Sequence, residues 1–131
     1  MFIDYRYSKE VAISESLNLT VSLRGTREVK NNCQVFHLLG QLDAFSEAIF
    51  QKVVLGYVKE TTNKIILDLS QIDFIDSSGL GALVRIAKQI EGVKGKLQIV
   101  SNPRVTQTVK MVRLEKFLKL KNSLDEALKD I

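Results

Sequence analysis

The chain has 131 residues, of which 45% are hydrophobic and 26% charged, so it suits one globular domain with an ordinary surface. No apolar run approaches the roughly 20 residues of a transmembrane helix, and the charged N-terminus lacks the apolar stretch of a signal peptide. Cys33 is the one cysteine and His37 the one histidine, which excludes an internal disulfide and a Cys/His zinc site. We expect a cytoplasmic protein with no cofactor and no metal, although these counts leave open a site made of carboxylates alone.

The net charge of +4 and the pI of about 9.2 raise the question of nucleic-acid binding. The basic residues are spread along the chain and mixed with acidic ones. Their densest stretch, Lys110–Lys121, also holds apolar residues and predicts a solvated face over a buried one. Neither a zinc-finger, a helix-turn-helix nor an aromatic RNA-binding signature occurs. We therefore expect no direct contact with nucleic acid and no membrane insertion.

Hydrophobic periodicity predicts strands where apolar residues alternate or run continuously, and helices where they recur every three to four residues. In chain order the predicted elements are strands at Leu17–Arg24 and Cys33–Leu39, a helix at Ala44–Glu60, a buried strand at Lys64–Leu69, a helix at Ser78–Glu91, a strand at Leu97–Val100, a helix at Pro103–Arg113, a candidate fifth strand at Phe117–Leu120 and a final helix to Ile131. Residues 1–16 show no clear period. We interpret them as an N-terminal extension or an extra edge strand, which leaves residues 17–131 as the domain.

Local signals mark several boundaries. Asn31–Asn32 predicts a turn between the first two strands, which we expect to be antiparallel, and the second strand should end at Gly40. Asp43 or a serine three residues later can cap the first helix, while Asn102–Pro103 and the capping box Ser123–Glu126 open the last two. The alternation of strands and helices predicts a single α/β domain. Its sheet should be mixed and mostly parallel, with four to five strands and about four helices packed against it.

Sites of open α/β sheets lie at the carboxyl ends of strands, and two predicted loops qualify, Gly40–Asp43 and Asp73–Gly79. We expect these loops to be neighbours. In the second loop, Phe74 and Ile75 should anchor the chain to the core. Phe45 is likewise assigned to packing.

The helix that follows begins with polar residues. Asp76 and Ser77 stand at its start, and either side chain can accept a hydrogen bond from the free amides of the first turn. The two glycines that follow would weaken a helix interior, so they indicate either a close approach to the backbone or tight packing on the sheet. These residues alone leave open a capped helix with glycines for packing and no function.

The stretch from Asp68 to Leu83, DLSQIDFIDSSGLGAL, closely resembles the signature of the STAS domain, the fold of anti-sigma-factor antagonists. Gly40–Asp43 resembles the family's Gly-x-Leu-Asp after the second strand, and Asn102–Val105 resembles the segment that opens its third helix. The resemblance covers about residues 17 to 131. It departs from the family at Gln41, where an acid is frequent.

The resemblance implies a non-catalytic regulatory protein of transcription. Ser77 would be phosphorylated by a serine kinase with a histidine-kinase-like ATPase fold that doubles as an anti-sigma factor, and a serine phosphatase would restore the hydroxyl. The unphosphorylated protein would bind the kinase and so release the sigma factor. Ser78 is the alternative acceptor. The partner-binding residues implied by the resemblance are Asp43, Asp76, Ser78, Gly79 and Leu80.

Three other interpretations compete with this one. A serine on a strand-to-helix turn also resembles a hydrolase nucleophile, but the pattern lacks Gly-x-Ser-x-Gly and His37 lies mid-strand. The segment Gly92–Lys96 lacks the P-loop spacing and predicts a tight turn. A STAS adaptor subunit of a stress-signalling or lipid-transport complex stays open. Lipid-transport adaptors commonly deviate around the phosphoserine, whereas this motif keeps Asp76-Ser77-Ser78.

Overall fold

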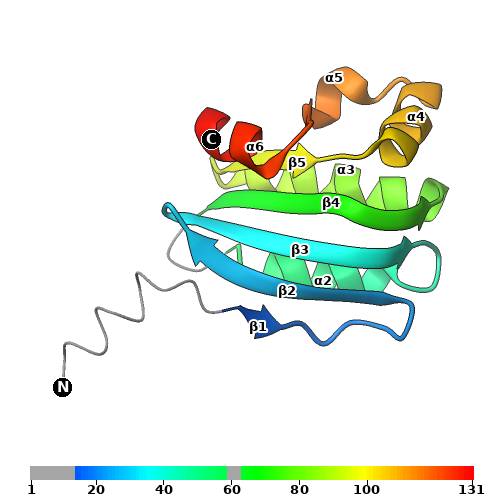
Figure 1. The fold of residues 1–131 in the computed structure, drawn as a ribbon, viewed down its shortest axis with the longest axis horizontal. Helices are drawn as coiled ribbons and strands as arrows, with labels where there is room; N and C mark the ends of the chain where they lie inside the picture. Colours follow the sequence, from blue (N-terminus) through cyan, green and yellow to red (C-terminus); the bar gives the residue numbers. More distant parts are fainter. Residues whose placement is uncertain (1–13, 59–62) are drawn as a thin grey trace.

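A mixed sheet forms the centre of the computed structural model, which describes residues 14–58 and 63–131 (Figure 1). Its six strands lie in the order β1-β2-β3-β4-β5-β6. The strands are β1 (Glu15–Ser16), β2 (Leu23–Lys30), β3 (Cys33–Leu42), β4 (Lys64–Ile75), β5 (Lys96–Val100) and β6 (Leu120–Lys121). The helices are α2 (Glu47–Gly56), α3 (Ser77–Gly92), α4 (Pro103–Met111), α5 (Glu115–Leu118) and α6 (Leu124–Asp130).

The sheet joins an antiparallel half to a parallel half. β1, β2 and β3 are antiparallel neighbours, and β3 to β6 are parallel. Helices α2 and α3 make two of the crossovers and lie together behind the sheet in Figure 1, whereas α6 lies in front of it. The predicted fold class is therefore confirmed, and the sheet exceeds the predicted four to five strands because two-residue strands stand at both edges.

Both faces of the central strands are covered. Alternate residues of β3 and β4, such as Phe36 and Leu67, face α2 and α3 and have 0% exposure. Residues on the opposite face, such as Val35 and Ile66, pack under α6 around Ala127. Burial on both faces explains the nearly continuous apolar run at the start of β4.

The predicted strand Leu17–Arg24 is wrong for most of its length, because β2 begins only at Leu23 and continues through the polar stretch to the turn. β2 pairs with β3 without interruption from Leu23↔Gly40 to Lys30↔Cys33. The position and length of β2 are therefore determined by its pairing with β3 across a two-residue turn, and not by apolar alternation.

The strands β3 and β4 run further than predicted. Gly40 does not end β3, because it lies inside the strand with a φ of 106° beside a register shift, and the strand continues to Leu42. β4 continues beyond Leu69 to Ile75, so the first part of the predicted loop Asp73–Gly79 is strand. The carboxyl ends of β3 and β4 are paired up to Leu42↔Ile75, which brings the two candidate loops to one edge of the sheet.

The four predicted helices are confirmed with shifted ends, and two caps form as predicted. Asn102 Oδ1 accepts from the backbone N–H of Val105 at 2.8 Å, and Ser123 Oγ accepts from that of Glu126 at 3.1 Å. The predicted strand Phe117–Leu120 is wrong in its first half, where α5 stands before the short β6.

Most of the predicted N-terminal extension, residues 1–16, lies outside the described residues, and its last two residues form β1. The segment Gly92–Lys96 is a tight turn, as predicted, in which the amide of Gly95 donates back to the carbonyl of Ile90 at 2.8 Å. Across residues 14–58 and 63–131, no helix combines the length and the hydropathy needed to cross a bilayer.

Candidate functional site at the start of helix α3

Asp76 joins the two candidate loops. It occupies the N-cap position of α3, where its Oδ1 accepts from the amide of Gly79 at 3.0 Å. Its Oδ2 accepts from the amide of Ala44 at 3.2 Å, and its own amide donates to the carbonyl of Leu42 at 3.3 Å. The expectation that the two loops are neighbours is thereby confirmed, and one side chain both caps the helix and holds the loop after β3.

Asp43 holds the loop after β3 from within. It is only 9% exposed, and its Oδ1 accepts from the amides of Phe45 and Ser46 at 3.0 and 3.2 Å. Ser46 occupies the N-cap position of α2, and its hydroxyl donates to the carbonyl of Gln41 at 2.9 Å. The carboxylate of Asp43 thus maintains the loop conformation more than it presents charge to solvent.

The two serines differ in exposure. Ser77, the first residue of α3, is exposed, whereas Ser78 is half-buried. The next two residues, Gly79 and Leu80, are buried. A Cβ at Gly79 would collide with the carbonyl oxygen of Leu42, so only glycine lets the first turn lie directly on the end of β3. The backbone contact fixes where the hydroxyl of Ser77 stands.

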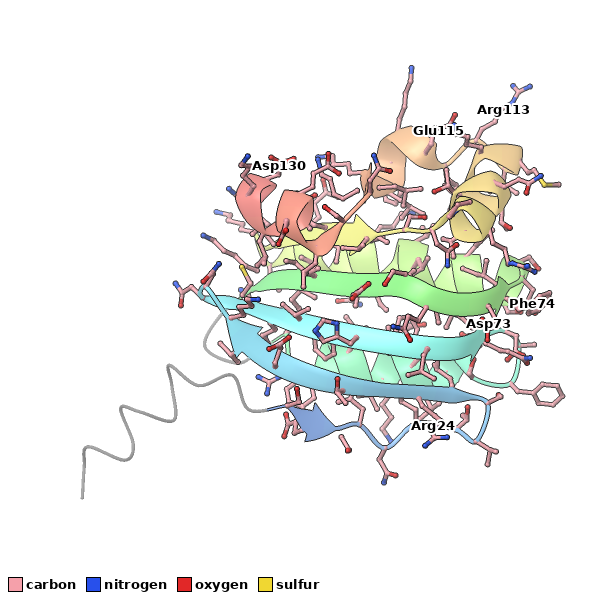
Figure 2. All side chains as sticks on the ribbon, in the orientation of Figure 1. Arg24, Asp73, Phe74, Arg113, Glu115 and Asp130 are labelled. Carbon is pink, nitrogen blue, oxygen red and sulfur yellow. The ribbon has the colours of Figure 1, made fainter. Side chains whose placement is uncertain are left out.

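The two candidate loops each carry an exposed aromatic side chain, contrary to the sequence prediction. Phe45 is 88% exposed and Phe74 47% exposed, so neither anchors its loop to the core, while Ile75 does so at 5% exposure. Figure 2 shows Asp73 and Phe74 projecting at the end of the sheet. Phe45 precedes the helical period of α2, and Phe74 alternates with the buried Ile75. Those positions are the signals that could have revealed both side chains.

His37 lies apart from Ser77. Its Nδ1 stands 2.8 Å from Asp68 Oδ2 and its Nε2 stands 2.6 Å from Glu28 Oε2, so carboxylates occupy both ring nitrogens. Burial acts to lower the pKa of His37, but the hydrogen bonds to Glu28 and Asp68 outweigh it and raise the pKa above 6.5. With both nitrogens engaged, His37 is not placed to act as a base for a serine nucleophile.

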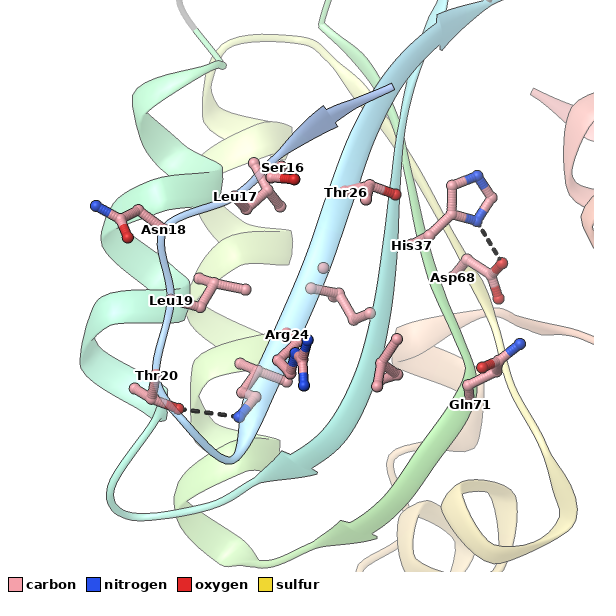
Figure 3. Close-up of a pocket in the computed structure, with 14 residues that line it drawn as sticks. Ser16, Leu17, Asn18, Leu19, Thr20, Arg24, Thr26, His37, Asp68 and Gln71 are labelled. Carbon is pink, nitrogen blue, oxygen red and sulfur yellow. Dashed lines mark hydrogen bonds and ion pairs between the residues drawn. The ribbon is translucent and has the colours of Figure 1, made fainter. Parts of the chain in front are cut away.

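A hollow of about 610 Å³ lies beside His37 and Asp68 and is bordered by Arg24 and the segment before β2 (Figure 3). None of the residues from Asp76 to Leu80 lines it. The predicted site residues Asp76 to Leu80 therefore lie outside this hollow, at the carboxyl edge of the sheet.

Known proteins resemble this chain over most of its length. A protein of Thermotoga neapolitana, provisionally named an anti-sigma factor antagonist, is 32% identical over 93 residues, which cover 70% of this chain and 82% of the relative. A crystal structure of an anti-sigma factor antagonist from Mycobacterium paratuberculosis superposes with a TM-score of 0.78 at 22% identity, covering 88% of this chain and 98% of that one.

The phosphorylated form of the Bacillus cell fate determinant SpoIIAA also shares the fold. It superposes with a TM-score of 0.58 at 18% identity, over 90% of this chain and 98% of that one. The family model for the STAS domain matches residues 26–127, which is well over half of the sequence. With the fold, the Asp76-capped helix start and this match in agreement, the chain belongs to the STAS domain family.

Proposed function

We propose that this protein is an anti-sigma factor antagonist of the cytoplasm, switched by phosphorylation of Ser77. The unphosphorylated form binds a serine kinase that also acts as an anti-sigma factor, and the phosphorylated form releases it. The observation that carries the proposal is the exposed Ser77 hydroxyl at the start of α3, beside the loop that Asp76 ties down. The names of the relatives and the phosphorylated form of SpoIIAA support the same role.

The chemistry needs no catalytic group from this chain. The kinase transfers the γ-phosphoryl group of ATP to Ser77 Oγ, which loses its proton, and ADP leaves. A serine phosphatase later hydrolyses the ester to the free hydroxyl and inorganic phosphate. The phosphate carries about −1.5 to −2 charges and stands at a helix N-terminus, which favours negative charge. The fold therefore accepts the modification.

The phosphate leaves the fold intact but weakens the complex with the kinase. The partner meets Ser77 at the edge of the sheet that also carries Asp73, Asp76 and the exposed rings of Phe45 and Phe74. Where the two phosphate charges face a carboxylate of the partner at roughly 6 Å, with an effective dielectric of roughly 40–80, they repel it by about 1–3 kcal/mol. Affinity for the kinase should fall about tenfold to a hundredfold before steric exclusion is counted.

The other predicted site residues contribute in different ways. Asp76 and Ser78 border the hydroxyl and contact the partner directly. Asp43, Gly79 and Leu80 are buried and act by holding the loop and the first turn in place. We add Phe45 and Phe74 as apolar contacts, because interface cores are enriched in aromatic side chains.

The test is a pull-down followed by a kinase assay. The full chain should recover a histidine-kinase-like ATPase, and mass spectrometry after incubation with that kinase and ATP should place one phosphate on Ser77. The variant Ser77→Ala should remain unmodified, while Ser78→Ala should be modified normally. Modification of Ser78 alone, or recovery of a transporter ATPase in place of the kinase, would refute the proposal, and the second result would favour the adaptor role.

A further inference from the structure

Ser77 shares one face of α3 with Gly81 and Arg85, which follow at intervals of four residues. Residues four apart on a helix are neighbours, with about 5–6 Å between their Cβ positions. Ser77 and Arg85 are exposed, and Gly81 between them is half-buried. Long helical side chains lean toward the helix N-terminus, so Arg85 leans toward Ser77.

The contacts of Arg85 show where its guanidinium lies. Its Nε donates to Gln51 Oε1 at 2.8 Å and its Nη2 donates to Glu47 Oε2 at 2.9 Å, both on α2. A Cβ at Gly81 would stand 3.3 Å from Nη1, so the guanidinium covers the helix at Gly81 because that residue has no side chain. Within the described part of the chain, Nη1 donates a hydrogen bond to no acceptor. This free donor lies over the helix turn that follows Ser77.

We propose that Arg85 is the built-in counter-ion of phosphorylated Ser77. The Arg85 side chain can swing further toward the helix N-terminus, where Nη1 can donate to an oxygen of a phosphoryl group on Ser77 in a charge-assisted hydrogen bond. The glycine at position 81 leaves the path between the two groups open. This inference rests on the proposed function, because it concerns the same modified serine.

The contact between Arg85 and the phosphate also links phosphorylation of Ser77 to helix α2. The side chains of Arg85 and Glu47 are 51% and 26% exposed, so their ion pair is partly solvated and weakly held. A doubly charged phosphate competes for the same guanidinium and draws it from Glu47. Phosphorylation thereby changes the start of α2, which adjoins the loop that carries Phe45, without any change in the sheet.

The test measures the second ionisation of phosphoserine by ³¹P NMR on the full chain with phosphoserine installed at position 77 during synthesis. An adjacent guanidinium stabilises the dianion and lowers this pKa from its ordinary value of about 6. The variant Arg85→Gln should raise the proton affinity of the phosphate about twofold to fivefold, as expected for a partly exposed ion pair. Glu47→Gln removes the carboxylate that competes for Arg85, so this variant should lower the proton affinity of the phosphate.

Lys88→Gln is the matched control, since it removes the same charge from an exposed position one turn further along α3. An equal shift in Arg85→Gln and Lys88→Gln, or no shift in Arg85→Gln, would overturn the proposal. Installing the phosphoserine directly separates this test from the proposed function. A kinase that fails to modify Ser77 refutes the proposed function, whereas the NMR result alone decides the role of Arg85.

Discussion

At the scale of single residues, Gly79 is the position where the start of α3 touches the sheet. A Cβ there would collide with the Leu42 carbonyl and lie 3.0 Å from Ile75 Cγ1. We predict that Gly79→Ala lowers the free energy of unfolding by about 1–3 kcal/mol, the usual cost of overpacking, as measured by urea denaturation. Gly56→Ala is the control, because nothing lies within 4 Å of its added Cβ, and it should be neutral or slightly stabilising. Equal effects of the two substitutions would contradict the close contact.

His37 makes the stability depend on pH. Its two partners come from neighbouring strands, Glu28 from β2 and Asp68 from β4. Protonated histidine donates from both ring nitrogens, whereas the neutral ring has one N–H and turns a lone pair toward one carboxylate. Because the pKa is raised in the folded state, this stabilisation is fully present below about pH 6.5, the unfolded value, and is lost as the pH rises through the folded pKa.

We therefore predict that the urea midpoint of the wild-type protein falls between pH 6 and pH 8. The loss should be smaller in His37→Gln, which cannot change its charge. Midpoints for the two proteins at several pH values give the comparison. Parallel pH profiles would show that His37 does not supply the dependence.

Some residues of the candidate site could be predicted from the sequence and others could not. The difference is whether a residue depends on neighbours in the same element or on contacts with a distant part of the chain. Asp76 and Ser77 stand at a local helix start, so the motif alone predicts both positions. The contacts of Arg85 with Glu47 and Gln51 depend on how α2 packs beside α3. No spacing within one element contains that information.

At the scale of elements, the β2–β3 hairpin depends on its turn. Asn31 and Asn32 have φ values of 52° and 68°, the left-handed conformations of a primed two-residue turn. We predict that Asn31→Val destabilises the fold by about 1–2 kcal/mol, because a β-branched residue is strained at positive φ. Asn31→Gly should cost little, and thermal unfolding of both variants would show the difference. A turn that tolerates valine as well as glycine would argue against the primed geometry.

The same turn explains why some strand ends could be predicted from the sequence and others could not. The turn itself was predicted correctly from its two asparagines, but the strand before it was placed at Leu17–Arg24. The polar residues after Arg24 become strand only because β3 pairs with them from the turn onward. Likewise, β4 extends past its apolar run to Ile75 because β3 continues beside it. In both cases a partner strand, and not local propensity, sets the length.

At the scale of the whole molecule, the proposed acceptor Ser77 is exposed beside the core and is not part of it. The cluster of buried side chains around Phe36 and Leu67 lies between the sheet and the helices α2 and α3, whereas Ser77 stands at the sheet's carboxyl edge. A phosphate at a helix N-terminus replaces solvent contacts and removes no packed side chain. The alternation of strands and helices in the sequence was enough to predict this arrangement, because crossover connections in parallel sheets have one handedness.

We predict that the fold is unchanged by phosphorylation while affinity for the kinase is lost. The free energy of unfolding of the Ser77-phosphorylated protein should lie within about 1 kcal/mol of the unmodified value, since charges at helix ends contribute about that much. Amide chemical shifts should change in the first turn of α3, at the adjoining end of β4, in the Asp43–Ser46 loop and near Glu47, and stay constant in β5 and in β4 up to Leu69. Shifts spread through the sheet would mean that the phosphate acts by refolding the domain, and the local charge mechanism would then be wrong.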